Sequence, residues 1–150
     1  MRRLLDTNTW IALAVEAHAM HGAARRWYDA EPLTAGELLF CRATEISFLR
    51  LVTQARVMNA CGVVPLTNAE AVGYLDNLYR DPAVARADEP PATRALWLRL
   101  AGVPVASPHV WMDAYLAAFA IALGAEFVTF DRAFTRFAAD GLIVRVLDGP

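Results

Sequence analysis

Residues 3–10 read RLLDTNTW, a short apolar stretch followed at once by polar residues that can cap a helix. Residues 3–5 predict a buried strand that ends at Asp6. Thr7 or Asn8 is then expected to cap a helix that turns its apolar side chains inward. A buried strand followed directly by an amphipathic helix is typical of an α/β fold.

The rest of the chain repeats this alternation of apolar segments with segments of helical periodicity. Further strands are expected at residues 38–41, 127–129 and 143–147. Helices are expected at residues 21–29, 43–57, 67–79, 92–100 and 108–123, with a short helix at 133–137. Strands that alternate with helices favour an α/β sandwich around a mainly parallel central sheet.

Composition points to one cytoplasmic domain. The 150 residues are 57% hydrophobic, and much of that fraction is alanine, a strong helix former. A chain of this length suits a single domain over 1–150. The longest apolar stretch, 114–125, is shorter than the roughly 20 residues that a membrane-spanning helix needs. An early Asp6 argues against a signal peptide, and Cys41 and Cys61 are interpreted as reduced thiols.

Charge restricts the possible chemistry. The formal net charge is −2 and the pI is about 5.9, whereas many nucleic-acid-binding domains are strongly basic. All 14 basic residues are arginine, which excludes chemistry that requires a lysine, including Walker-type phosphate loops. Arg42 and Arg132 adjoin acidic motifs and are candidates for contacts with RNA phosphates, because a guanidinium group suits phosphate geometry.

Four acidic residues are expected to meet at one edge of the sheet. Asp6 ends the first predicted strand, and Asp131 comes two residues after the strand at 127–129. Glu45 lies near the start of the helix that follows the second strand, and Asp113 lies early in the last long helix. In open parallel sheets, ligands bind beyond the carboxyl ends of the strands. The four carboxylates therefore define a candidate site.

The apolar surroundings of these carboxylates favour a function over a solvated surface role. Asp6 follows two leucines, and Asp131 follows a strand rich in aromatic and β-branched residues. Burying such groups is costly unless they are paired or bound to a cation. Clustered carboxylates also raise one another's pKa, which a divalent cation would offset. Oxygen ligands suit Mg²⁺ or Mn²⁺, which can activate water for phosphodiester cleavage.

These motifs together carry a family resemblance that covers essentially the whole chain. They are residues 4–8, the helix of Glu45, residues 111–118 and residues 128–134. In order and approximate spacing they resemble a PIN domain, and in particular the VapC-type toxins of bacterial toxin–antitoxin pairs. The resemblance implies a three-layer α/β/α fold and a Mg²⁺- or Mn²⁺-dependent endoribonuclease. It also implies an RNA substrate, a cognate antitoxin and a homodimer.

The resemblance assigns the catalytic and metal-binding roles to the acidic residues of the motifs, Asp6, Glu45, Asp113 and Asp131. It also suggests that Thr129 and Asn8 orient these carboxylates. No acidic position of the pattern is missing.

Several other classes stay open at this stage. A phosphatase with an aspartyl nucleophile is disfavoured because Asp6 has no second aspartate two positions later. A phosphate-accepting receiver domain would need a lysine. A non-catalytic module that binds RNA or protein, a nuclease of RNA processing, and a nuclease that cuts DNA structures are all compatible with the acidic motifs.

Overall fold

The computed structural model describes residues 1–149 and is built around a parallel sheet. The five strands found there are β1 (Arg3–Leu5), β2 (Leu38–Phe40), β3 (Val84–Arg86), β4 (Glu126–Thr129) and β5 (Val144–Val146). Their order across the sheet is β3-β2-β1-β4-β5, and every neighbouring pair is parallel. The order reverses direction at β1, so the carboxyl end of β1 is the switch point where ligands of such sheets bind.

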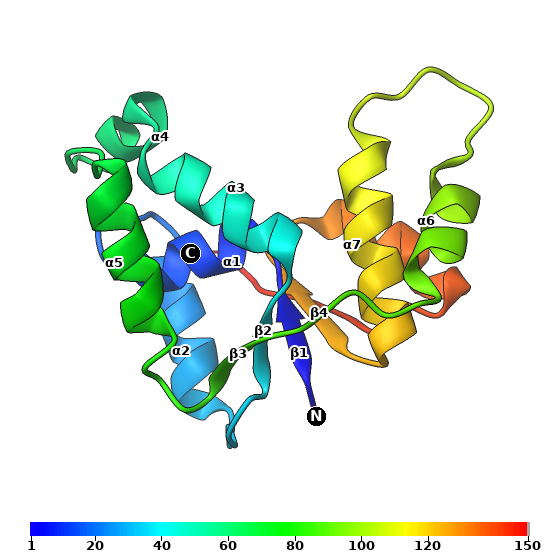
Figure 1. Cartoon of the computed structure of the whole chain (residues 1–150), viewed down its shortest axis with the longest axis horizontal. Coiled ribbons are helices and arrows are strands. Elements are labelled where there is room, and N and C mark those ends of the chain that lie inside the picture. Colours follow the sequence, from blue (N-terminus) through cyan, green and yellow to red (C-terminus); the bar gives the residue numbers. More distant parts are fainter. Residues whose placement is uncertain (150) are drawn as a thin grey trace.

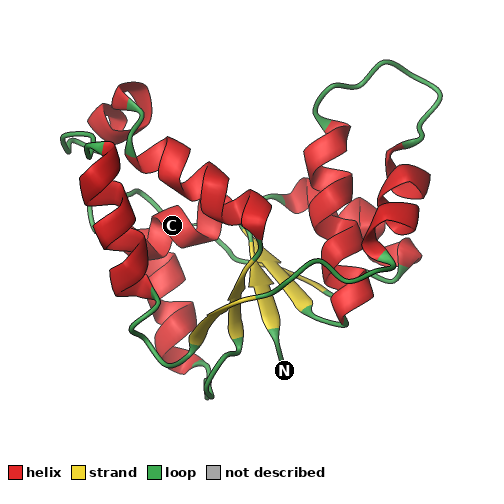
Figure 2. Cartoon of the chain, in the orientation of Figure 1, coloured by secondary structure: helices red, strands yellow, loops and turns green. Residues whose placement is uncertain are grey.

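Helices cover both faces of the sheet (Figures 1 and 2). Those before β4 are α1 (Thr7–Ala14), α2 (His21–Ala30), α3 (Arg42–Val52), α4 (Ala55–Ala60), α5 (Asn68–Leu78), α6 (Thr93–Ala101) and α7 (Val110–Leu123). A 3₁₀ helix, η1 (Arg132–Asp140), follows β4. In Figure 1, α1 to α5 lie on one side of the sheet, and α6 and α7 lie on the other. The α/β class with a parallel central sheet, predicted from the sequence, is confirmed.

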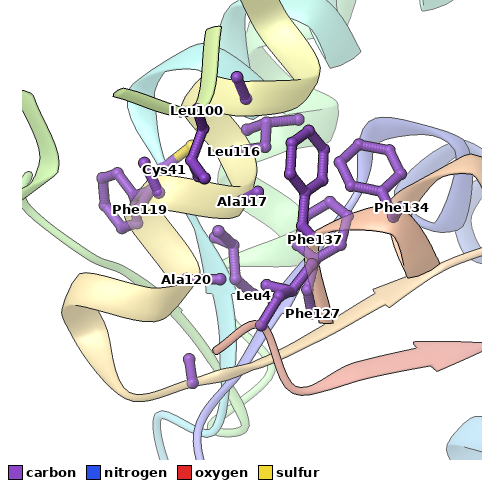
Figure 3. Packing of buried hydrophobic residues seen from close by; sticks show 14 of the residues in the cluster. Leu4, Cys41, Leu100, Leu116, Ala117, Phe119, Ala120, Phe127, Phe134 and Phe137 are labelled. Carbon is purple, nitrogen blue, oxygen red and sulfur yellow. The ribbon is translucent and has the colours of Figure 1, made fainter. Parts of the chain in front are cut away.

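Two apolar cores lie on opposite faces because successive side chains of a strand point to opposite sides. Leu4 and Phe127 belong to the core beneath α6, α7 and η1, which Figure 3 shows around α7. Leu5 and Val128 belong to the core beneath α1, α3 and α5. All four side chains are fully buried. The central strands are therefore apolar on both faces, as expected for a parallel sheet between helix layers.

Small side chains let α7 lie close to the sheet. Four of its five alanines are buried, and the helix ends at Gly124, whose φ of 64° is a left-handed conformation that suits glycine. Within residues 1–149, no helix combines the length and the apolar character needed to cross a membrane.

The prediction of one helix over residues 43–57 is wrong in its extent. α3 ends at Val52, where the Thr53 hydroxyl donates a hydrogen bond to the Leu49 carbonyl oxygen at 2.9 Å. Gln54 is extended, and α4 then begins as a separate helix. Within α3, Glu45 is buried whereas Ile46 is 51% exposed.

Two further details differ from the prediction. Asp6, and not Thr7 or Asn8, is the N-cap residue of α1. The strand β3 was not predicted, because it is a partly exposed edge strand of three residues with little apolar character. Its pairing with β2 supplies the order that the sequence could not show.

Candidate active site

Asp6 lies at the carboxyl end of β1, the switch point of the sheet. Its backbone N–H donates to the Val128 carbonyl oxygen at 2.9 Å, which keeps the chain paired with β4 one residue beyond the strand. Its own carbonyl oxygen accepts from the Thr9 and Trp10 N–H groups, which starts α1. The side chain is largely buried, with the residue only 9% exposed. The backbone therefore fixes this carboxylate between a strand and a helix.

Two side chains hold the Asp6 carboxylate in one orientation. The Thr129 hydroxyl donates to Asp6 Oδ2 at 2.6 Å, and Asn8 Nδ2 donates to the same oxygen at 2.8 Å. Asn8 Oδ1 accepts from the Phe130 N–H at 3.2 Å, which fixes the amide group in turn. Both bonds end on Oδ2, so the other oxygen of the carboxylate is not used by them.

Thr129 also connects Asp6 to Asp131. Its Oγ1 accepts a hydrogen bond from the Asp131 N–H at 3.0 Å. The Asp131 carboxylate accepts from the Ala133 N–H at 2.8 Å and so caps η1. Thr129 itself is fully buried. A single threonine at the end of β4 therefore positions two of the predicted carboxylates.

Burial, a hydrogen bond and neighbouring charges all act on the pKa of Asp6. Burial is the main cause that raises the pKa of Asp6 above its ordinary value. The negative charges of Asp113 and Asp131 raise the pKa further, whereas the hydrogen bond from Thr129 lowers it. Asp113 lies in the first turn of α7, and Arg136 Nη2 contacts its Oδ2 at 2.7 Å. An arginine of η1 therefore neutralises one charge at this site.

Glu45 is buried at the start of α3 beside two partners. The Tyr79 hydroxyl donates to Glu45 Oε1 at 2.6 Å. Burial, followed by this hydrogen bond, raises the pKa of Tyr79. Arg42 Nη1 lies 2.9 Å from Glu45 Oε2, but the pair is not aligned as a hydrogen bond. Oε2 is thus a buried carboxylate oxygen without a hydrogen-bond donor in the described residues.

The structure brings the predicted acidic residues together only in part. The charges of Asp113 and Asp131 raise the pKa of Asp6. Glu45 instead contacts Tyr79 and Arg42. Across residues 1–149, no three Asp, Glu, His or Cys side chains converge tightly enough to hold a metal ion. Arginines pair instead with two of these carboxylates, Asp113 and Glu45.

The donor set still fits a hard divalent cation. The available ligands are carboxylate oxygens, the kind that Mg²⁺ and Mn²⁺ prefer. Glu45 Oε2 is buried without a hydrogen-bond donor in the described residues, and the Arg42 guanidinium at 2.9 Å offsets its charge. The carboxylate oxygens of Asp6, Glu45, Asp113 and Asp131 are therefore donors of the chemical kind that such an ion prefers.

Two residues at the site were not predicted from the sequence. Tyr79 lies at the end of α5, and the helical pattern there does not indicate its contact with Glu45. Arg136 contacts Asp113 from η1. Of the two arginines predicted to contact RNA, Arg42 pairs with Glu45, and Arg132 lies at the surface 3.1 Å from Asp148. Arg136 had a weak signal, since it lies five residues after Asp131.

Comparison with known proteins agrees with this geometry. The family model described as "PIN domain" matches residues 3–140. The chain belongs to the PIN-domain family. It is 46% identical over 145 residues to Ribonuclease VapC41 of Mycobacterium tuberculosis, a match that covers 96% of this chain and 97% of the relative. The family predicted from the acidic motifs is therefore confirmed.

Solved structures show the same fold at lower identity. VapBC2 from Rickettsia felis, bound to a DNA fragment from its promoter, gives a TM-score of 0.65 at 16% identity and covers 99% of this PIN-domain chain and 100% of its own. VapC20 of Mycobacterium tuberculosis, described as a Sarcin-Ricin loop cleaving toxin, gives 0.63 at 21% identity, with 95% and 98% covered. The three-layer α/β/α arrangement of this chain is thus that of VapC proteins.

Proposed function

We propose that this PIN-domain chain is a Mg²⁺- or Mn²⁺-dependent endoribonuclease and the toxin of a toxin–antitoxin pair. The observation that carries the proposal is the buried Asp6 carboxylate, which Thr129 and Asn8 orient at the switch point of the sheet near Asp113 and Asp131. Close relationship to Ribonuclease VapC41 over nearly the whole chain supports RNA as the substrate. Residues 1–150 would then act as one nuclease domain.

Asp6, Glu45, Asp113 and Asp131 would hold the cation. A divalent cation bound by carboxylates supplies activation of water and stabilisation of the negative charge that develops at a phosphodiester. Thr129 and Asn8 are positioning residues, because they contact Asp6 and leave its second oxygen free of their hydrogen bonds. These hydrogen bonds fix the orientation of Asp6, so this ligand needs little rearrangement when a cation binds.

The arginines at the rim would bind the RNA backbone. Arg42 has 64% of its side chain exposed and Arg132 has 81%, so both can reach a phosphate in solvent. Arginine binds phosphate oxygens through two parallel N–H groups. This rim provides positive charge locally in a chain whose net charge is −2.

The described histidines offer no pair for metal-independent RNA cleavage. That chemistry uses the ribose 2′-OH as nucleophile, with side chains to move its proton. His18 and His21 lie near the start of α2, where His21 Nδ1 contacts the Ala12 carbonyl oxygen. His109 is alone at the start of α7. Water is therefore the proposed nucleophile.

The proposed partners are RNA, a cognate antitoxin and a second copy of the chain. Solved VapBC assemblies, such as the DNA-bound complex from Salmonella typhimurium, have the same fold as this chain. An antitoxin would keep the toxin inactive until needed, and both would act in the cytoplasm, where RNA is translated.

The test is RNA cleavage by purified variants with Mg²⁺ or Mn²⁺. Asp6→Asn and Asp113→Asn should abolish cleavage and keep the circular dichroism spectrum of the wild type, because each change removes a charge but little volume. Asp88→Asn is the matched control, since Asp88 has an 88% exposed side chain and pairs only with Arg86. Full activity in folded Asp6→Asn would refute the assignment.

A further inference from the structure

A pocket of about 420 Å³ lies between the α6–α7 loop and η1, on the side of the sheet opposite α1 to α5. The loop is the long segment at the upper right of Figure 1. Val103 and Val105 of the loop line the pocket together with Leu100 and Phe137. Figure 3 shows Leu100 and Phe137 in the apolar cluster around α7, so this wall of the pocket is part of the core.

One arginine links the pocket to the acidic site. Arg136 lines the pocket, and its Nη2 contacts Asp113 Oδ2 at 2.7 Å. Asp113 in turn is close enough to Asp6 to raise its pKa. A polymer bound across the carboxylates would therefore extend one unit into this pocket.

Two guanidinium groups line the pocket and keep donors available. Arg99 Nη1 contacts Asp140 Oδ1 at 2.9 Å, and Arg136 contacts Asp113 through Nη2 alone. Within residues 1–149, neither arginine makes another side-chain hydrogen bond. Their side chains are 56% and 46% exposed. Each guanidinium carries five N–H donors, so most of them make no hydrogen bond to a side chain of the described residues and are available to an anion.

The Arg136 guanidinium is also fixed in place. It lies 4.7 Å from the centre of the Phe137 ring, within the range of a cation–π contact. Phe137 is buried, so core packing holds its ring in position. The guanidinium group therefore lies between a carboxylate of the site and an apolar wall of the pocket, and two contacts hold it there.

We propose that this pocket is a subsite for one nucleotide of single-stranded RNA next to the scissile phosphate. The base would lie against Val103, Val105 and Leu100, and Arg99 and Arg136 would bind the adjoining phosphates. Apolar walls with arginine beside them match a nucleotide, which joins a base with apolar faces to an anion. The inference rests on the proposed ribonuclease function and adds to it the place where a flanking nucleotide is recognised.

The test measures binding of a fluorescein-labelled, mixed-sequence 12-nucleotide RNA to the Asp6→Asn chain by fluorescence anisotropy at several salt concentrations. Adding Arg99→Gln to this background should weaken binding about fivefold and lower the salt slope by about 0.7, the value for one phosphate contact with a single strand. Arg136→Gln should act likewise. Arg94→Gln is the matched control, because Arg94 is exposed on the same helix as Arg99, changes the net charge equally and does not line the pocket.

A second measurement does not depend on substitutions. The same RNA carrying 4-thiouridine should crosslink on irradiation to peptides within residues 99–110 or 132–140. Crosslinks confined to other segments would overturn the subsite. So would equal loss of binding in Arg94→Gln and Arg99→Gln, which would show a general charge effect.

The outcomes separate the subsite from the proposed function. If the folded Asp6→Asn chain binds no RNA and the wild type cleaves none, the ribonuclease proposal fails. If RNA binds but Arg99→Gln and Arg136→Gln bind it unchanged, the subsite alone is refuted. The same holds if these variants lose only the binding of a partner protein, because the pocket would then serve that protein.

Discussion

Replacing Thr129 with valine tests how the acidic site is built. Valine has nearly the shape of threonine but lacks the hydroxyl, so the fully buried position keeps its packing. The change removes the 2.6 Å hydrogen bond to Asp6 Oδ2 and the acceptor for the Asp131 N–H. Asn8 remains as a donor to Asp6. The perturbation therefore affects the orientation of Asp6 without opening a cavity.

The expected cost follows from the kind of hydrogen bond that is lost. A hydrogen bond to a charged group contributes roughly 1.5–3 kcal/mol to stability. Because Asp131 is exposed, we expect water to replace the acceptor that its N–H group loses. The free energy of unfolding should therefore fall by about 2 kcal/mol. For a chain of this size the melting temperature should fall by about 4–8 °C. Loss of a residue that orients a metal ligand typically costs about 10–100-fold in activity.

The matched control is Thr93→Val. Thr93 is also fully buried, but its hydroxyl has no hydrogen-bond partner in the described residues. Removing an unpaired buried hydroxyl should leave stability unchanged or increase it. Urea unfolding followed by circular dichroism gives both free energies, and RNA cleavage gives both activities. Equal stability and activity in the two valine variants would refute the role given to Thr129.

Two further predictions concern charge and toxicity. With EDTA present, Asp6→Asn should be more stable than the wild type at neutral pH. Burial raises the pKa of Asp6 in the folded chain, so the wild type loses stability as the pH rises from the ordinary carboxyl pKa through the raised pKa of the folded chain. The difference should shrink as the pH falls below the ordinary carboxyl value, and melting curves that differ by the same amount at pH 3 and pH 7 would contradict this. Expression of the wild-type chain should arrest bacterial growth, with relief by the co-expressed partner and no arrest by Asp6→Asn; equal growth with wild type and Asp6→Asn would remove support for the toxin proposal.

Four of the five described strands could be predicted because their signals are local, whereas the roles of the four carboxylates stay predictions. Residues 3–5 are apolar and end at a polar cap, and observed β1 has those bounds. Gly124 ends α7 in the left-handed conformation that glycine favours. Four motifs in order along the chain also indicated the PIN-domain family, which is confirmed. Each of these signals depends on neighbours in the sequence.

The missing parts depend on residues that are distant in the sequence. Tyr79 contacts Glu45 across 34 positions, and Arg136 contacts Asp113 across 23. Tertiary packing also buries the charged Glu45 and leaves its apolar neighbour Ile46 exposed, which the composition of α3 alone does not indicate. Propensity and spacing describe one element at a time, so they do not determine which cation neutralises which carboxylate.

Analysis of the product ends tests the central claim most directly. Cleavage by water with a divalent cation at the acidic site leaves the ribose 2′-OH out of the chemistry. Products formed with Mg²⁺ or Mn²⁺ should carry a 5′-phosphate and a 3′-hydroxyl, and a substrate with one 2′-deoxy sugar at the cleavage site should still be cut. EDTA should stop the reaction. A 2′,3′-cyclic phosphate formed in the presence of EDTA would contradict the account.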